Sequence, residues 1–288
     1  MSSLLDVEAP ADSSVRLPVI QPWKPALGAV VTGLQLDSGR LSSGARDALV
    51  RALLDYGALV FEPGVLGPQS FTSLLAEFGE VSLYAGPKTP TAADNANVNI
   101  VDSSSKRQAR NFLWHIDQAF RADPPSLTAL YGQEVPSFGG DTLFSNAVLA
   151  YERLDPHFAA YIETLTAVHY WDATGHIADR FDDPAEAGRQ RAINAPIETP
   201  LVRVHPETGR KQLFVNESYT TYIKNVSRTT SQHLLGILFE AIKEPEVEAR
   251  FTWQPGAAVL WDNRVVQHRG IGDFAGQRRV FYRGCVRR

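Results

Sequence analysis

The chain has 288 residues, a formal net charge of -4 at pH 7, 44% hydrophobic residues and 21% charged residues. This length suits one large domain, because all-β sandwiches and barrels reach such sizes without dividing. A sequence pI near 6.0 gives no sign of the basic surface that binds nucleic acid, so we expect no nucleic-acid partner.

The N-terminal segment is polar, acidic and contains proline, so we expect a flexible arm over residues 1–15 and a single domain over residues 16–288. The segment lacks the basic and apolar regions of a secretory signal. No later run reaches the roughly 20 apolar residues that cross a bilayer. We therefore expect a cytoplasmic protein without a membrane partner. The single cysteine, Cys285, is expected to be a buried strand residue.

The predicted elements begin with a helix that Ser42 or Ser43 can cap and that ends near Tyr56. A second helix follows Pro68 and stops at Gly79. Further helices are expected over about 146–165 and 229–243. Between and after them lie short segments with the composition of strands: ALVF, NVNIV, NFLWHID, SLTALYG, DTLFS, TAVHYW, LVRV, KQLFVN, ARFTW, AAVLW and RRVFYRGCV.

Two polar, Asp-rich stretches, 84–110 and 171–195, are predicted to be loops that can cover a site. Many short strands with a few helices, and no alternation of strand and helix, predict a mainly β fold with flanking helices. The expected architecture is a double-stranded β-helix, or jelly roll, whose open end can hold a metal between two sheets.

The WHID motif places His115 and Asp117 two residues apart, so that in an extended strand both project from one face. This pair alone is a weak signal in a chain with seven histidines. A third candidate, His268, follows the apolar segment AAVLW and the polar turn DNR. Two neutral imidazoles and one carboxylate form a facial triad that leaves adjacent positions open, which is typical of non-haem ferrous iron.

The remaining histidines have less suitable contexts. His169 with Asp172 and His176 with Asp179 have the i, i+3 spacing of a helix or turn. We expect His169 to be a hydrogen-bonded histidine on a sheet face and His176 to lie in a loop. Three others are expected at the surface or in packing: His157, His205 and His233.

The C-terminal segment RRVFYRGC carries two arginines with the period of a strand. The alternation puts Arg279, Phe281, Arg283 and Cys285 on one face. Buried arginines need anions, and a guanidinium binds a carboxylate through two parallel hydrogen bonds. The alternative for either arginine alone is an exposed salt bridge on an edge strand.

Taken together, these motifs resemble the TauD/TfdA family of Fe(II)- and 2-oxoglutarate-dependent dioxygenases, and most closely its taurine dioxygenase branch. The resemblance runs from about Val19 to the C-terminus through WHID, PSFGGDTLFSN, LFVNESYTTYI, WQPG, WDNRVVQH and QRRVFYR, in that order. It implies a jelly-roll core in which three side chains hold Fe(II): His115, Asp117 and His268.

The resemblance also implies which residues surround the metal. Thr142 and Arg279 would hold the distal carboxylate of 2-oxoglutarate. Trp261 would flank the iron, although a plain core tryptophan is an equal interpretation. Asn111 and Arg283 would contact the substrate, which suggests that the substrate is polar or anionic.

The substrate pocket departs from the taurine enzymes at two places. Their FGELHIH motif is FGEVSLY here, with Ser82 and Tyr84 at the histidine positions. Tyr219 replaces a phenylalanine of the taurine pocket and adds a hydroxyl that can either bind substrate or simply pack. Taurine itself is therefore not the expected substrate.

The implied reaction couples O2 and 2-oxoglutarate to the oxidation of a C–H bond in a small polar or anionic molecule, with release of succinate and CO2. Hydroxylation is the expected outcome, and desaturation or oxidative cyclisation in a biosynthetic pathway would use the same cofactors. Asp117 argues against the related halogenases, which carry a small residue there. A zinc hydrolase or isomerase of cupin type and a non-enzymatic jelly roll are the alternatives of other classes. Family members are often dimers or tetramers, so the resemblance is compatible with a homo-oligomer and leaves the oligomeric state open.

Overall fold

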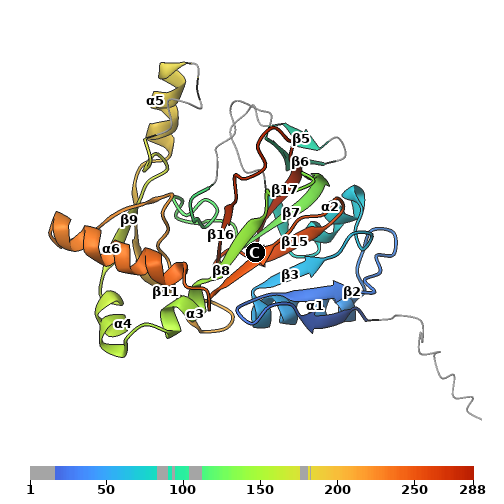
Figure 1. Cartoon of the computed structure of the whole chain (residues 1–288), viewed down its shortest axis with the longest axis horizontal. Helices are drawn as coiled ribbons and strands as arrows, with labels where there is room; N and C mark the ends of the chain where they lie inside the picture. The colour runs from blue at the N-terminus through green and yellow to red at the C-terminus, as the bar shows by residue number, and fades with distance from the viewer. Residues whose placement is uncertain (1–16, 83–89, 93–94, 104–111, 176–180, 182) are drawn as a thin grey trace, which may run out of the picture.

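The computed structural model describes residues 17–82, 90–92, 95–103, 112–175, 181 and 183–288 (Figure 1). The arm predicted over residues 1–15 lies outside them. Among the described residues, no helix combines the length and the apolar character that crossing a bilayer requires.

The largest element is a mixed sheet whose central strands carry most of the core. Its strands follow the order β1-β2-β3-β15-β7-β17-β6-β5, and β4 pairs with β17. Within the described part of this sheet, only the pair of β2 and β3 runs parallel. The strands are β1 (Val19–Pro22), β2 (Ala29–Thr32), β3 (Ala58–Phe61), β4 (Glu80–Ser82), β5 (Thr91–Ala92), β6 (Asn95–Asp102), β7 (Leu127–Glu134), β15 (Ala258–Asp262) and β17 (Val280–Arg287).

Three smaller sheets complete the β structure. A three-stranded sheet of order β14-β8-β16 lies beside the large sheet and carries His268. The others have the orders β10-β9-β13 and β11-β12. Their strands are β8 (Thr142–Asn146), β9 (Thr166–His169), β10 (Ile197–Pro200), β11 (Val202–Val204), β12 (Lys211–Leu213), β13 (Thr220–Ile223), β14 (Glu248–Phe251) and β16 (Val266–Gly270).

The alternation along β15 shows how the large sheet is covered on both faces. Ala258 and Leu260 pack in the core formed with the N-terminal helices. Val259 and Trp261 instead pack with Phe144 of β8 in a second core, between the large sheet and the β14-β8-β16 sheet. Because successive side chains of a strand point to opposite faces, one apolar strand serves both cores. The second core leads directly to the predicted metal ligands.

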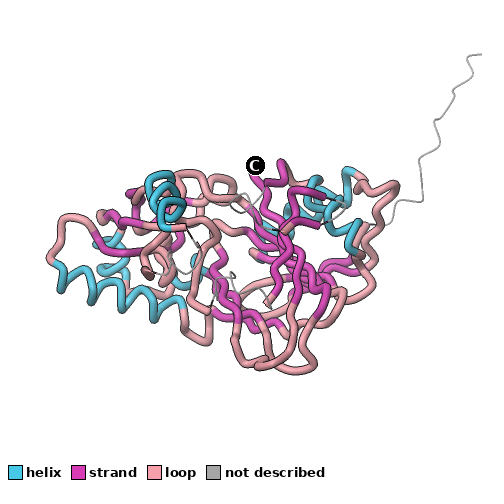
Figure 2. The backbone as a smooth tube through the Cα atoms, turned by 90° about the horizontal axis from the view of Figure 1, so that it is seen from above, coloured by secondary structure: helices cyan, strands magenta, loops and turns pink. Residues whose placement is uncertain are grey.

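Two N-terminal helices cover the outer face of the large sheet. Helix α1 (Ser43–Tyr56) begins where the Ser42 hydroxyl accepts a hydrogen bond from the Ala45 N–H at 3.2 Å, and it ends at Gly57, whose φ of 75° is left-handed. This is the arrangement that the sequence predicts. Helix α2 (Pro68–Ala76) has the predicted start but ends three residues before Gly79. Figure 2 shows the helices in two groups, one at each end of the molecule, with strands between them.

The helix predicted over about 146–165 is two helices, α3 (Ala147–Glu152) and α4 (Pro156–Ile162). The break falls before Pro156, whose ring prevents the preceding helix from continuing. The Asp155 carboxylate then caps α4 by accepting from the N–H groups of His157 and Phe158. Helix α6 (Arg228–Ile242) lies within one residue of its predicted bounds.

The stretch 171–195, predicted to be a loop, contains a further helix, α5 (Pro184–Ile193). Asp183 caps it and Pro184 occupies its first turn, so local signals for a helix are present. Its only buried residue is Ala187. The sequence therefore has no apolar stripe from which this helix could be predicted. In Figure 1 this helix projects from the body of the molecule.

Candidate metal centre

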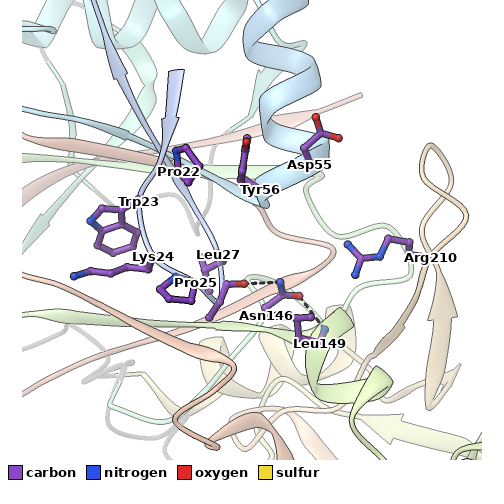
Figure 3. A pocket seen from close by; sticks show the side chains of 11 residues that line it. Pro22, Trp23, Lys24, Pro25, Leu27, Asp55, Tyr56, Asn146, Leu149 and Arg210 are labelled. Atoms are coloured by element: carbon purple, nitrogen blue, oxygen red, sulfur yellow. Dashed lines mark hydrogen bonds between the residues drawn. The ribbon is translucent and has the colours of Figure 1, made fainter. Parts of the chain in front are cut away.

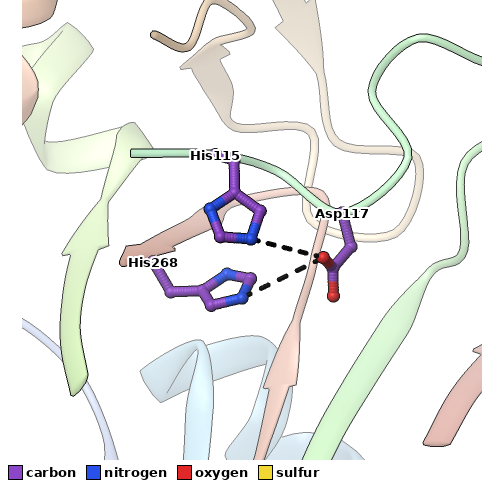
Figure 4. Close-up of side chains that lie close together, drawn as sticks. All are labelled: His115, Asp117 and His268. Carbon is purple, nitrogen blue, oxygen red and sulfur yellow. Dashed lines mark ion pairs between the residues drawn. The ribbon is translucent and has the colours of Figure 1, made fainter. Parts of the chain in front are cut away.

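His115, Asp117 and His268 converge in the interior, although the third is far from the others in the chain. His115 and His268 form an isolated β-bridge, with N–O distances of 3.1 and 3.0 Å. Their ring centroids lie 4.1 Å apart. Oδ1 of Asp117 lies 3.6 Å from Nε2 of His115 and 4.0 Å from Nε2 of His268 (Figure 4). One ligand atom of each residue thus lies within 4.8 Å of the other two, close enough for one ion to contact all three.

The strand predicted for NFLWHID is wrong over its described part. Only His115 pairs in a β-bridge, and a turn begins at Asp117. Gln118 then has a φ of 56°, in the left-handed region. The two ligand candidates therefore do not share a strand face by the i, i+2 rule, and Asp117 reaches the histidines from a turn.

Asn263, which is not among the predicted site residues, supplies this turn with the hydrogen bonds that a strand partner would give. The Asn263 Oδ1 accepts a hydrogen bond from the Asp117 N–H at 2.8 Å, and its Nδ2 donates to the Asp117 carbonyl at 3.0 Å. Asn263 stands in the WDNR motif, which belongs to the sequence pattern that resembles the family. Nothing in that local pattern indicates a partner 146 positions away.

The two imidazoles are buried, with 1% and 6% of the residue exposed for His115 and His268. Burial lowers the pKa of His115, although the charge of Asp117 opposes this. Burial and the neighbouring His115 lower the pKa of His268 well below its usual value. Both rings are therefore neutral at physiological pH, as ligation of a metal requires.

The hydrogen bonds of His115 define which nitrogen can bind a metal. Its Nδ1 lies 2.9 Å from the Leu113 carbonyl, and a carbonyl only accepts, so Nδ1 carries the proton. Nε2 therefore presents a lone pair toward Asp117. This buried nitrogen has no hydrogen-bond partner among the described residues. A buried unpartnered acceptor beside a carboxylate fits a metal ligand, because an unsatisfied polar atom costs about 1–3 kcal/mol.

Asp117 is ionised and faces a cation as well as the histidines. Burial opposes its ionisation, but the Arg283 guanidinium, helped by His268 and His115, holds the pKa of Asp117 at about 2. Arg283 Nη2 forms an ion pair with Asp117 Oδ1, and only 6% of Arg283 is exposed. The strand β17 therefore brings a buried positive charge to the edge of the candidate metal centre, as its alternation predicted.

Arg279 and Thr142 meet at the start of β17 and β8. Arg279 Nη2 lies 3.4 Å from Thr142 Oγ1, and its Nε donates to the Gly140 carbonyl at 3.0 Å. The guanidinium lies 4.0 Å from the centroid of the Phe281 ring. Burial lowers the pKa of Arg279 to about 10, so it is still charged at neutral pH. A partly desolvated guanidinium beside a hydroxyl can bind a carboxylate.

Aromatic rings surround the histidines. Trp261 is fully buried, and its ring centroid lies 4.6 Å from that of His268. It therefore flanks the candidate centre and also belongs to the core. Tyr219 meets His115 edge-on at 6.5 Å and Phe120 at 5.0 Å, which places the predicted substrate residue beside the centre.

The other sequence predictions have mixed outcomes. Asn111, Tyr84, His176 and Asp179 lie outside the described residues. His169 is buried and lies 2.9 Å from Thr199 Oγ1 and 3.1 Å from Thr220 Oγ1, as expected of a hydrogen-bonded histidine on a sheet. Three minor predictions are confirmed by burial: exposed His157, exposed His233 and buried Cys285.

His205 is not a surface residue, because only 1% of it is exposed. It forms a second cluster of possible ligands with Glu207 and Asp262. However, Nε2 lies 3.0 Å from Asp262 Oδ2, and Nδ1 accepts from the N–H groups of Glu207 and Thr208. Arg264 pairs with both carboxylates, at 2.6 and 2.8 Å. The nitrogens are occupied and a cation already neutralises the acids, so this cluster is a structural ion network.

A cavity of about 570 Å³ lies between the β1–β2 hairpin, the end of α1 and α3 (Figure 3). Lys24, Asp55 and Arg210 contribute charges of both signs to its wall, and Asn146 uses its amide to hydrogen-bond Ala26 and the start of α3. None of the predicted site residues that the structure describes lines this cavity.

Comparison with known proteins identifies the family. The family model described as "Taurine catabolism dioxygenase TauD, TfdA family" matches residues 20–285. The chain belongs to the TauD/TfdA family. An alkylsulfatase of Acinetobacter baylyi is 34% identical over 265 residues, covering 89% of this chain and 81% of the relative. An (S)-phenoxypropionate/alpha-ketoglutarate-dioxygenase of Sphingobium herbicidovorans is 30% identical over 277 residues, covering 93% and 94%.

A solved taurine dioxygenase from Burkholderia xenovorans superposes with a TM-score of 0.78 at 29% identity, covering 94% of this chain and 89% of that chain. The predicted double-stranded β-helix is thereby confirmed. As a TauD/TfdA member, the protein is a non-haem iron oxidoreductase that uses Fe(II), 2-oxoglutarate and O2. The zinc hydrolase and the non-enzymatic jelly roll are therefore wrong.

Proposed function

We propose that this TauD/TfdA dioxygenase oxidises, and in the first instance hydroxylates, a C–H bond of a small organic anion. His115, Asp117 and His268 hold Fe(II) in this proposal, and Thr142 with Arg279 binds the distal carboxylate of 2-oxoglutarate. The observation that carries the proposal is the buried Asp117, which faces two neutral imidazoles on one side and Arg283 on another.

The side chains of the protein orient the metal ligands and the 2-oxoglutarate carboxylate, and they fix which ring nitrogen of His115 carries a proton. Fe(II), 2-oxoglutarate and O2 supply the oxidising chemistry when bound, with succinate and CO2 as co-products. The hydrogen bond from His115 Nδ1 to the Leu113 carbonyl keeps Nε2 deprotonated and oriented. Arg279 is steadied by the Gly140 carbonyl and the Phe281 ring, so that it meets a carboxylate in one defined position.

The anionic character of the substrate follows from Arg283. A buried guanidinium is stable only near negative charge. Arg283 brings a buried positive charge beside Asp117, where an anionic substrate group can bind it. Relatives named for alkyl sulfates and phenoxypropionate act on molecules that carry such a group, which supports the proposal. Asn111, Tyr84 and Tyr219 complete the proposed substrate contacts.

Assembly and location belong to the proposal too. We infer a homo-oligomeric, cytoplasmic enzyme whose only partners are small molecules. Sedimentation of the full chain tests the oligomer, and a monomer at all concentrations would remove that part of the proposal.

A panel of sulfonates, alkyl sulfates and aryloxyalkanoates, scored by stoichiometric succinate release, tests the function. We expect substrate-dependent succinate release with at least one anion and none with the matched neutral alcohols. Mass analysis of the product separates hydroxylation from desaturation or cyclisation. Asp117→Ala is expected to abolish Fe(II) binding and succinate formation, and normal turnover in that variant would exclude Asp117 as a ligand.

A further inference from the structure

Asn263 lies in the turn that joins β15 to β16, and none of its surface is exposed. Its amide makes three hydrogen bonds to the backbone around Asp117. It accepts from the Asp117 N–H at 2.8 Å and donates to the carbonyls of Asp117 and Pro125 at 3.0 and 2.9 Å. One side chain thus binds both backbone polar groups of the residue that carries the carboxylate.

The turn at Asp117 needs such a partner because it has left the sheet. The last residue before the turn that forms a β-bridge is His115. Gln118 has a positive φ of 56°, a conformation that costs a non-glycine residue on the order of 1 kcal/mol or more. Without lateral hydrogen bonds, the backbone of Asp117 could relax and move its carboxylate relative to His115. The amide of Asn263 opposes that relaxation.

Asn263 is itself held from both sides. Its N–H donates to the Ser126 carbonyl at 2.9 Å, and the preceding Asp262 N–H donates to the Gly57 carbonyl at 2.9 Å. The Asp262 carboxylate is bound by His205 at 3.0 Å and by Arg264 at 2.6 Å. The buried ion network described above therefore fixes the turn from which Asn263 points toward the metal centre.

The same turn leads into β16, which carries His268. The turn between β15 and β16 thus leads directly to one candidate ligand and fixes the backbone of another. We propose that Asn263 is a positioning residue that sets the distance and direction of the Asp117 carboxylate relative to His268. This inference rests on the proposed role of Asp117 as a metal ligand, and it adds a residue that contacts neither metal nor substrate.

The test compares Asn263→Ala with Asn146→Ala, a matched control. Asn146 also makes three hydrogen bonds to backbone groups, from Val148 and Leu149 at 3.0 and 3.1 Å and to Ala26 at 2.9 Å (Figure 3). Mn(II) affinity is measured by electron paramagnetic resonance on the full chain, alongside urea unfolding. We expect about 10- to 100-fold weaker Mn(II) binding for Asn263→Ala, as for other residues that orient ligands, and a change within about twofold for Asn146→Ala.

Equal Mn(II) affinity in Asn263→Ala and wild type would overturn the inference. So would an equal loss in both variants, since that loss would reflect general destabilisation. Failure of the proposed function is separate, because wild-type protein would then neither bind Mn(II) nor release succinate.

A second variant covers the case in which Asn263→Ala does not fold. Asn263→Asp keeps the shape and the acceptor for the Asp117 N–H, but it turns a carboxylate toward two carbonyl oxygens. Added negative charge alone would tighten binding of a divalent cation. Urea unfolding shows whether Asn263→Asp is folded under the assay conditions. Weaker Mn(II) binding by the folded variant supports the inference, whereas unchanged or tighter binding overturns it.

Discussion

Arg283 and Asp117 form a buried ion pair, in which the guanidinium contacts the same carboxylate oxygen that lies 3.6 Å from His115 Nε2. Strand β17 supplies the arginine, and the turn fixed by Asn263 supplies the aspartate. A single carboxylate oxygen therefore faces both the candidate metal position and the cation proposed to bind substrate. Substitution of Arg283 should consequently change how strongly a bound divalent cation stabilises the protein.

Arg283→Met should make the metal-free protein depend on a divalent cation for stability. It leaves the charge of Asp117 buried without its guanidinium, which costs about 3–5 kcal/mol of unfolding free energy. Urea unfolding with chelator and with excess Mn(II) measures this, and Mn(II) should stabilise the variant more than wild type. Arg287→Met, which removes only the exposed pair with Asp123, is the control. The same Mn(II)-induced gain in wild type and Arg283→Met would contradict the prediction.

Arg279→Ala should weaken 2-oxoglutarate binding by about 10- to 100-fold, because hydrogen bonds to a charged group contribute about 1.5–3 kcal/mol. Titration of the cofactor in the presence of Mn(II) measures the change. The neighbouring Arg278 is exposed and pairs with Asp102 at 2.6 Å and Glu134 at 3.0 Å, so Arg278→Ala should leave 2-oxoglutarate affinity unchanged. Equal affinities in the two variants would remove Arg279 from its proposed role.

His169 should make the protein less stable in mild acid. Burial, with a contribution from Arg203, lowers its pKa from 6.5 to about 4. The unfolded chain therefore takes up this proton first, and stability present above about pH 6.5 is lost as the pH falls toward about 4. The loss amounts to about 3 kcal/mol. Urea unfolding across this range should show a weaker pH dependence in His169→Gln, and parallel curves for the two proteins would refute the assignment.

His205→Ala should reduce stability without changing the number of metal ions bound. It removes the hydrogen bond to Asp262 at 3.0 Å, while Arg264 still neutralises that carboxylate, so we expect a loss of about 1–3 kcal/mol. Titration with Mn(II) should give one ion per chain in wild type and variant alike. Two ions in wild type and one in His205→Ala would show that the second cluster binds metal.

The sequence predicted those helices and strands whose start, end or burial pattern depends on neighbouring residues in the chain. The cap at Ser42, the left-handed Gly57 and the apolar alternation of β15 all depend on residues within a few positions of one another. Pro156 is an equally local signal, and its ring divides the single helix predicted over 146–165 into α3 and α4.

By itself, the sequence determined the chemistry of the centre: two imidazoles, one carboxylate and two arginines on a strand, in an order that resembles a known family. Tertiary structure alone decided how they meet. Asp117 lies on a turn instead of a strand because Asn263, 146 positions away, binds its backbone. His205 can be buried because Asp262 and the backbone of Glu207 and Thr208 hydrogen-bond both of its ring nitrogens. Periodicity records which face a residue takes within its own element, whereas these contacts depend on which distant elements pack together, and no local pattern encodes that.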